Sequence, residues 1–461
     1  MARVAGVDSS TQSVKIVVRD SETGAFIAES SRPHPAGTEV DPEQWWSALQ
    51  AVIEDIGGLQ SLAAISIAGQ QHGMVLLDET GKVIRKALLW NDTRSAPQAE
   101  ALNKAFPEIH NLTGSTLVAS FTASKVRWVY ENEPENAARV RAIALPHDWL
   151  SWKLSGSTKL EDLFTDRSDA SGTGYFNPVT NEYNREIVQW ALGHSDVVLP
   201  RIVAPHEPGA KVGNCIIACG AGDNAGAALG VGAEVGDLVI SLGTSGTAFV
   251  VSSQSSHDPS GEVAGFADAS GNYLPLACTL NAAKIFDSVS QLLNVDHETF
   301  SALALSAPSG AEGLMVIPHF DGERTPNRPD ARGQFLGISH SNFTPENIAR
   351  ASIEGVIAGL AYAVEALKRE GISYSRILLV GGAAKNRAVQ EIAADIFQNE
   401  IILPPQGEYV ANGAAKQAAW ALRGFIPVWQ VGTVEKIEPP ARPSNVKPQY
   451  MERISRLSTL K

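Results

Sequence analysis

Residues 4–18 read Val-Ala-Gly-Val-Asp-Ser-Ser-Thr-Gln-Ser-Val-Lys-Ile-Val-Val, which is an apolar run, a short polar turn and a second apolar run. Residues 238–251 repeat that plan as Leu-Val-Ile-Ser-Leu-Gly-Thr-Ser-Gly-Thr-Ala-Phe-Val-Val. Each segment is typical of a β-hairpin whose tip carries hydroxyls and, in the second copy, glycines. Backbone N–H groups in such turns can form an anion-binding nest. Either segment alone could be an ordinary turn, but the repeat predicts a duplicated fold that holds a nucleotide between two halves.

Strands and helices are expected to alternate around both hairpins. Asp41 and Pro42 are typical of an N-cap and a first helical residue, and a buried strand is expected at 62–68. In the second half we expect a long helix over 345–369, and then a strand that ends in a glycine turn before another helix. The pattern predicts an α/β fold with a central cleft, divided into residues 1–228 and 229–461.

Composition excludes several classes of protein. The chain has 461 residues, is 44% hydrophobic and 19% charged, and carries a net charge of −13, which argues against nucleic-acid binding. Its three cysteines lack the partners of a zinc site and are expected to pack in the core; they are Cys215, Cys219 and Cys278. The absence of a signal-like or membrane-spanning apolar stretch predicts a cytoplasmic location with no membrane contact. Exposed surfaces of the second half could support a homodimer.

Asp223 stands out as one acidic residue in a run of glycines and alanines, residues 219–232. Small residues allow backbones and ligands to approach closely, and an isolated carboxylate in such a setting is a candidate general base. The alternative is that Asp223 caps the alanine-rich helix that follows it.

Asp8 follows the first predicted strand, beside the hydroxyls of the turn. A carboxylate there could hold Mg²⁺ directly or through water, or it could simply form the turn. The glycine turn at Gly381 and Gly382 is a generic ligand-binding turn before a helix. Because the chain contains no GxxxxGK[ST] loop, we expect the hairpin turns to hold any bound nucleotide.

Two long patterns carry a family resemblance. Residues 120–132 read Ser-Phe-Thr-Ala-Ser-Lys-Val-Arg-Trp-Val-Tyr-Glu-Asn, and a second pattern runs from Gly333-Gln-Phe-Leu-Gly-Ile to Asn347-Ile-Ala-Arg-Ala-Ser-Ile-Glu. Over essentially its full length the chain resembles the FGGY family of carbohydrate kinases, which belongs to the actin-like ATPases. The resemblance implies two actin-like, ribonuclease H-like domains, with ATP and Mg²⁺ as cofactors.

The resemblance also implies which residues bind the nucleotide. Its phosphate-1, phosphate-2 and adenosine motifs fall on Ser9, Ser10, Thr11, Gln12, Gly243, Thr244, Ser245, Gly381, Gly382 and Asn386, with Asp8 at the metal. Ser10 stands where the family usually has glycine. Asp223 would be the base that accepts the proton of the sugar hydroxyl as that hydroxyl attacks the γ-phosphorus.

Three further stretches are similar to those of family members that phosphorylate D-xylulose: residues 69–74, 88–94 and 222–224. They imply a sugar site made by Gln71, His72, Trp90, Asp223 and Asn224, although Gln71 replaces the usual methionine. The expected reaction phosphorylates the C5 hydroxyl of a ketopentose, giving D-xylulose 5-phosphate for the pentose phosphate pathway.

Other interpretations remain open at this stage. The acceptor could be ribulose, fuculose, rhamnulose, gluconate or glycerol, or the chain could be a non-catalytic actin-like sensor or ATPase. His72 could be an ordinary core histidine. Two polar pairs have no assigned role, Asp166 with Asp169 and His147 with Asp148.

Overall fold

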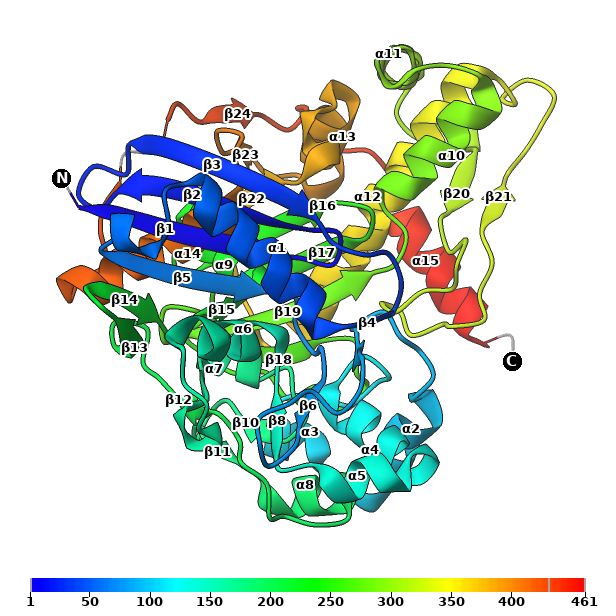
Figure 1. Cartoon of the computed structure of the whole chain (residues 1–461). Helices are drawn as coiled ribbons and strands as arrows, with labels where there is room; N and C mark the ends of the chain where they lie inside the picture. The colour runs from blue at the N-terminus through cyan, green and yellow to red at the C-terminus, as the bar shows by residue number, and fades with distance from the viewer. Residues whose placement is uncertain (1, 430–431, 460–461) are drawn as a thin grey trace.

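A computed structural model describes residues 2–429 and 432–459. Each half is built on a mixed sheet that begins with one of the two hairpins (Figure 1). The first sheet has the order β13 (Pro208–Val212), β14 (Cys215–Ala218), β5 (Ala64–Gly69), β1 (Arg3–Ser9), β2 (Ser13–Asp20) and β3 (Phe26–Pro33), and β15 (Ala221–Gly222) pairs with β5. The second sheet has the order β18 (Ala264–Ala267), β19 (Tyr273–Thr279), β17 (Gly246–Val250), β16 (Asp237–Leu242), β22 (Arg376–Val380), β23 (Ile401–Leu403) and β24 (Glu435–Ile437).

The hairpin strands are paired as the sequence repeat predicts. β1 runs antiparallel to β2, from the Arg3–Asp20 pair to the Ser9–Val14 pair, and parallel to β5. β16 likewise runs antiparallel to β17 and parallel to β22. Both sheets therefore have a hairpin next to a parallel strand, and the predicted duplication is confirmed.

Helices occupy the segments between the strands, and local sequence signals mark the start of some of them. In the first half they are α1 (Pro42–Asp55), α2 (Ala96–Ala105), α3 (Ile109–Thr113), α4 (Thr122–Asn132), α5 (Pro134–Arg139), α6 (Pro146–Ser155), α7 (Arg167–Ala170), α8 (Arg185–Leu192) and α9 (Asp223–Val231). In the second half they are α10 (Ala283–Leu293), α11 (His297–Ser306), α12 (Pro345–Arg369), α13 (Arg387–Phe397), α14 (Tyr409–Arg423) and α15 (Val446–Thr459). The Asp41 side chain caps α1, and α12 has the bounds predicted for it.

Short two-stranded ribbons join these elements. They are β4 (Glu39–Val40) with β7 (Ala87–Leu88), β6 (Val75–Leu77) with β8 (Ala142–Ala144), β9 (Phe164–Thr165) with β12 (Arg201–Ile202), β10 (Phe176–Asn177) with β11 (Glu182–Tyr183), and β20 (Met315–Ile317) with β21 (Gln334–Leu336). The three cysteines are free and buried, as expected of core residues.

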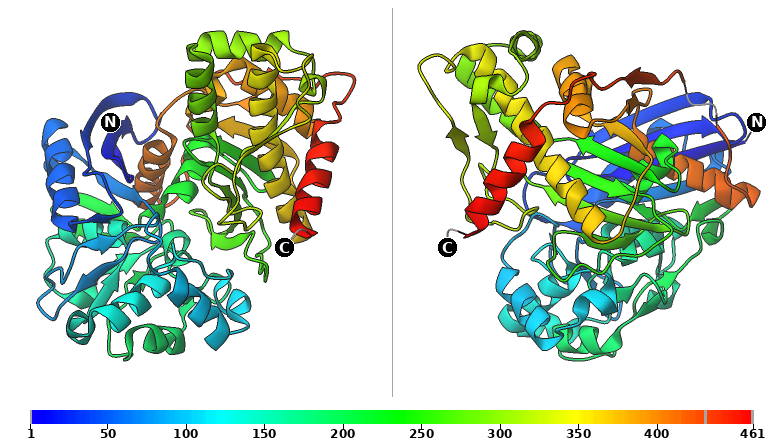
Figure 2. Two further views of the ribbon diagram at one scale, coloured as in Figure 1. Left: turned by 90° about the vertical axis from the view of Figure 1, so that its right-hand side faces the viewer. Right: turned by 180° about the vertical axis from the view of Figure 1, so that it is seen from behind.

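Helix α14 joins the two halves. Although it lies late in the sequence, it packs on β1 and β5 of the first sheet and crosses α9 (Figure 2). The approach is close because Gly6 has no side chain: a Cβ there would lie 1.9 Å from the carbonyl oxygen of Ala411. At the crossing with α9, a Cβ on Gly413 would lie 1.9 Å from the oxygen of Gly226. The predicted boundary at 228/229 falls inside α9, which continues to Val231, and α14 returns from the second half of the sequence to the first sheet.

Among the helices of the described residues, none combines the length and the apolar character that a membrane crossing requires.

Candidate active site

Asp8 lies in β1, just before the turn of the first hairpin. Its Oδ1 atom is buried without a partner among the described residues. Burial and the nearby charge of Asp223 raise the pKa of Asp8 to about 7, against the opposing charge of Lys15. Lys15 itself forms an ion pair with Glu408, at 2.7 Å, next to the start of α14. Asp8 and Asp223, 215 residues apart in sequence, therefore share one electrostatic site.

Ser10 fits the first turn without backbone strain. It lies outside the left-handed region of φ, and both its backbone N–H and its hydroxyl donate to the Ser13 carbonyl at 3.0 Å. The ring of His34 contacts the Ser10 carbonyl through Nδ1 at 2.8 Å. The departure from glycine is thus accommodated by a hydroxyl that closes the turn.

Asp223, Asn224 and Gln71 lie together, as the sequence predicts for the sugar site. The Asn224 amide donates to Asp223 Oδ1 at 3.0 Å and to Gln71 Oε1 at 3.5 Å. Gln71 also donates to the carbonyl of Ser168 at 3.3 Å. The three side chains form a continuous chain of hydrogen bonds between the start of α9 and the segment after β5.

Asp223 is the first residue of α9, and the N-cap is Gly222, whose position lacks a side-chain cap. Asp223 is therefore not the N-cap of α9, and the capping alternative is wrong. As an acidic residue in the first turn, Asp223 still stabilises the helix through its dipole. The Asp223 Oδ1 atom accepts the N–H of Asn224 at 2.8 Å. Burial raises the pKa of Asp223 to about 6, despite hydrogen bonds that lower it. Such a carboxylate is ionised at neutral pH and holds a proton better than an exposed one, as a general base requires.

His72 is a buried, neutral imidazole. Its backbone is left-handed, with φ at 68°, and its Nδ1 lies 2.6 Å from the Gly172 carbonyl. Burial, and the positive charge of Lys125, lower its pKa to about 3. Because a carbonyl only accepts, Nδ1 carries the proton and Nε2 has a lone pair that could accept a hydroxyl. One ring nitrogen of His72 is thus hydrogen-bonded, and the other can accept a hydrogen bond.

The Trp90 side chain contacts the turn of the first hairpin. Its indole N–H donates to the Thr11 hydroxyl at 2.9 Å, and that hydroxyl lies 3.4 Å from Gln70 Oε1. The segment after β5 is therefore connected to the first turn. The sequence predicts Trp90 at the sugar, and this bond connects it to the turn of the first hairpin.

The second hairpin lies directly against the predicted adenosine turn. Gly381 has φ at 98°, and a Cβ there would lie 2.5 Å from the carbonyl oxygen of Leu242. Leu242 is the last residue of β16, immediately before the turn of Gly243, Thr244 and Ser245. Thr244 is exposed at the tip. Glycine is required at 381 because the strand end and the ligand turn touch through backbone atoms.

A pocket of about 180 Å³ opens beside this turn. It is lined by Leu379, Val380, Gly381, Ala384, Lys385, Gln390, Leu403, Pro404, Pro405, Gln406, Tyr409, Thr433 and Glu435. Asn386 lies outside the lining: its side chain caps α13 and contacts the Ser301 hydroxyl at 2.9 Å. The predicted adenosine residues thus divide into Gly381 at the pocket and Asn386 in a structural cap.

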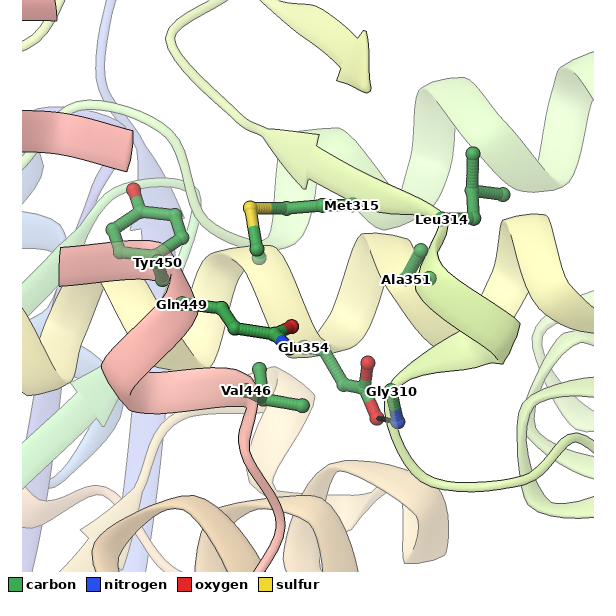
Figure 3. A pocket seen from close by; sticks show the side chains of 10 residues that line it. Gly310, Leu314, Met315, Ala351, Glu354, Val446, Gln449 and Tyr450 are labelled. Atoms are coloured by element: carbon green, nitrogen blue, oxygen red, sulfur yellow. Dashed lines mark hydrogen bonds between the residues drawn. The ribbon is translucent and has the colours of Figure 1, made fainter. Parts of the chain in front are cut away.

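A second pocket lies between α12, α15 and the segment before β20, with Glu354 and Tyr450 in its lining (Figure 3). Glu354 is engaged there by the N–H of Gly310, at 2.9 Å, and by Arg350, at 2.6 Å. This pocket contains none of the predicted site residues.

Sequence reasoning missed two cations near His72. Lys125 is fully buried and donates to the Ser120 carbonyl, and burial lowers its pKa to about 7. Arg324, from the other half of the chain, contributes a positive charge that also lowers the pKa of His72. Lys125 stands inside the pattern at 120–132, so a signal was present there. Arg324 carried none, because only tertiary structure brings it to the first half.

Comparison with known proteins adds the family to this geometry. Residues 3–230 match the N-terminal domain of the FGGY family of carbohydrate kinases, and residues 238–422 match its C-terminal domain. The chain belongs to this family. It is therefore an ATP-dependent carbohydrate kinase, which confirms the resemblance and the two-domain α/β fold and disfavours a non-catalytic sensor.

Individual relatives extend the match over nearly the whole chain. The xylulose kinase of Streptomyces rubiginosus is 42% identical over 445 residues, which cover 92% of this chain and 89% of that protein. The crystal structure of xylulose kinase from Bifidobacterium adolescentis is 44% identical with a TM-score of 0.91, and covers 98% of this chain and 99% of its own. The gluconate kinase of Lactobacillus acidophilus is 25% identical with a TM-score of 0.88, and covers 100% of this chain and 99% of its own.

Proposed function

We propose that this chain transfers the γ-phosphoryl group of ATP to the C5 hydroxyl of D-xylulose. The observation that carries the proposal is the hydrogen-bonded chain of Gln71, Asn224 and Asp223, in which burial raises the pKa of Asp223 to about 6. The relatives named xylulose kinase, at 42% and 44% identity, support D-xylulose over gluconate, whose kinase is 25% identical.

Asp223 would act as the general base. The C5 oxygen attacks the γ-phosphorus, its proton passes to the Asp223 carboxylate, and ADP leaves. General-base help of this kind is worth roughly 10²–10⁴-fold. Asn224 and Gln71 would orient the sugar and the carboxylate, while Nε2 of His72 would accept a sugar hydroxyl. Since the phosphoryl transition state is loose, positioning and charge neutralisation provide most of the rate.

The two hairpin turns would hold the phosphates of ATP through backbone N–H groups and hydroxyls. The relevant residues are Ser9, Ser10, Thr11 and Gln12 in the first turn, and Gly243, Thr244 and Ser245 in the second. The adenosine would occupy the pocket beside Gly381 and Gly382. With its side chain in the α13 cap, Asn386 would act from the rim of that site.

Asp8 fits a magnesium ion. Its Oδ1 atom is buried without a hydrogen-bond partner in the described part of the chain, and its pKa is raised, as expected of a carboxylate that lacks a counter-ion. When bound, the ion would neutralise charge on the phosphate oxygens.

An ADP-release assay with purified protein tests the substrate. D-xylulose should give a higher kcat/KM than ribulose, fuculose, rhamnulose, gluconate or glycerol, and the product should carry its phosphate on C5. A higher kcat/KM for another acceptor would assign the site to that sugar, and failure of every acceptor would contradict the catalytic proposal. The homodimer, the cytoplasmic location and the absence of nucleic acid as a partner stay predictions.

A further inference from the structure

His147 is buried between two strand ends that lead into the sugar site. It is the second residue of α6, and its side chain is completely inaccessible to solvent. A Cβ on Gly69 would lie 2.8 Å from the His147 Cβ, and one on Gly220 would lie 2.2 Å from its Cδ2. Gly69 immediately precedes the segment with Gln71, and Gly220 immediately precedes the strand that leads to Asp223. Both glycines leave room for the imidazole.

Both ring nitrogens of His147 face acceptors. Nδ1 lies 2.6 Å from Asp169 Oδ2 and 3.3 Å from Asp148 Oδ1, and Nε2 lies 3.2 Å from the carbonyl oxygen of Cys219. Nε2 carries a proton, because a carbonyl oxygen cannot donate. Burial raises the pKa of Asp169 to about 7, although the hydrogen bond and charge of His147 lower it. Above that pH Asp169 is a carboxylate, which cannot donate either, so Nδ1 also carries a proton and His147 is an imidazolium.

The surrounding charges agree with that assignment. Burial would lower the pKa of His147, but the charges of Asp148, Asp169 and Asp166 raise it to about 10. The ligand atoms of His147, Asp148 and Asp169 lie within 4.8 Å of one another, a spacing that a metal ion could also use. An imidazolium has no lone pair to give a metal, so the hydrogen bonds favour the proton.

The imidazolium connects two segments of the sugar site. Through Asp169 it holds α7. In that helix the Ser168 carbonyl accepts a hydrogen bond from the Gln71 amide, and the Ser168 hydroxyl accepts one from the Gly222 N–H at 3.0 Å. Through the Cys219 carbonyl it holds the turn that precedes Asp223. Among the described residues, no other side chain is hydrogen-bonded to both Asp169 and the Cys219 carbonyl.

We propose that His147 is a positioning residue of the kinase, whose two N–H groups fix the turn 219–222, and with it Asp223, against the segment that holds Gln71. This inference rests on the proposed role of Asp223. His147 touches neither substrate, so its effect is on geometry. An error of about 1 Å in such an arrangement can cost about 100-fold in rate.

Kinetics of two variants test the proposal. His147→Gln removes the charge and one of the two bonds, and Asp169→Asn keeps the shape but removes the counter-charge. Each should lower kcat by about 10- to 100-fold and raise the KM for D-xylulose, while the KM for ATP stays within about twofold. Assays are run well below the Tm of each variant, and rates are normalised to folded protein.

Glu354→Gln is the matched control for Asp169→Asn. Glu354 is likewise a buried carboxylate in an ion pair, at 2.6 Å from Arg350, but it lies in the other half of the chain. The Glu354→Gln variant should have a lower Tm, because the buried ion pair loses one charge. Its kcat and both KM values should stay within about twofold of the wild type. A loss of kcat in Glu354→Gln as large as in Asp169→Asn would overturn the positioning role, because buried charge loss alone would then explain the effect.

Two further outcomes would overturn the inference. Normal kcat and sugar KM in folded Asp169→Asn would do so, and so would a neutral His147 in the wild-type protein. The second is measured by ¹⁵N NMR of histidine-labelled protein at pH 8, where an ordinary imidazole with a pKa near 6.5 is neutral and His147 should be doubly protonated. If the Asp223→Asn variant kept full turnover, the proposed function would fail. If Asp223→Asn were inactive while His147→Gln had a normal kcat and sugar KM, only the positioning role of His147 would be contradicted.

Discussion

The two halves of the molecule share a backbone plan and differ in what their loops carry. In each, a hairpin lies beside a parallel strand, β5 in the first half and β22 in the second. β5 leads into Gln71 and His72, whereas β22 leads into Gly381 and Gly382. In the proposed function, the loop after β5 would present side chains to the sugar, and the loop after β22 would present backbone to the adenosine. The comparison shows one backbone plan in both halves, with different residue types in the loops that follow the equivalent strands.

Replacing Asp223 by asparagine should give the largest effect and tests whether the chemistry belongs to the first half. Turnover should fall by roughly 10²–10⁴-fold because the amide cannot take the proton. Calorimetry should still detect D-xylulose and ATP binding, with ATP affinity unchanged. Near-normal kcat would contradict the assignment, and lost ATP binding would break the division of labour.

The pH dependence of kcat/KM should identify the same group. Because burial raises the pKa of Asp223 to about 6, the base is ionised above that pH and protonated below it. Activity should therefore fall at least about tenfold between pH 7 and pH 5, because Asp8, whose pKa is raised to about 7, also gains a proton in this window. Stopped assays on protein shown to stay folded at both pH values provide the measurement. A profile that is flat down to pH 5 would exclude this carboxylate as the base.

Gly381→Ala tests whether the loop after β22 binds the nucleotide, as proposed. The added Cβ would lie 2.5 Å from the Leu242 carbonyl oxygen, at a φ of 98°. The KM for ATP should rise about tenfold, which corresponds to about 1.4 kcal/mol, with the KM for the sugar unchanged. Gly382→Ala is the matched control, because its Cβ would meet nothing within 4 Å and its φ lies outside the left-handed region. Equal effects of the two would show that the close approach to Leu242 is unimportant.

Trp90→Phe should give the smallest effect. It removes the bond to the Thr11 hydroxyl and keeps an aromatic ring, so about 0.5–1.5 kcal/mol is lost. The resulting change of about 2- to 10-fold should fall on kcat/KM. Trp152→Phe removes a comparable indole bond, to the Lys159 carbonyl at 2.9 Å, far from this turn in the sequence. It should lower stability alone; if it slowed turnover equally, the Trp90 bond would have no special role.

Much of the fold could be predicted because its signals are local. The alternation of apolar runs with short turns gave both hairpins, and Asp41 with Pro42 marked the start of α1. The packing of α14 on β1 could not be predicted, since helix 409–423 and Gly6 are separated by 400 residues and no local pattern records their contact.

The site was predictable in its residue types and less so in its bonds. Gln71, Asn224 and Asp223 were expected together and form one hydrogen-bonded chain. Asn386 was expected at the nucleotide, yet its side chain caps α13. A cap and a ligand contact use the same kind of polar residue after a turn, and the sequence does not distinguish them.

By itself, the sequence determined the duplicated hairpins and the family, and it singled out Asp223 as the carboxylate that we propose as the base. Only the tertiary structure decided protonation. His72 and His147 are both buried histidines, yet the pKa of the first is lowered to about 3 and that of the second is raised to about 10. The reason is physical: burial penalises the charged ring in both, and only His147 is surrounded by carboxylates that reverse the penalty, brought together from α6 and α7 by folding.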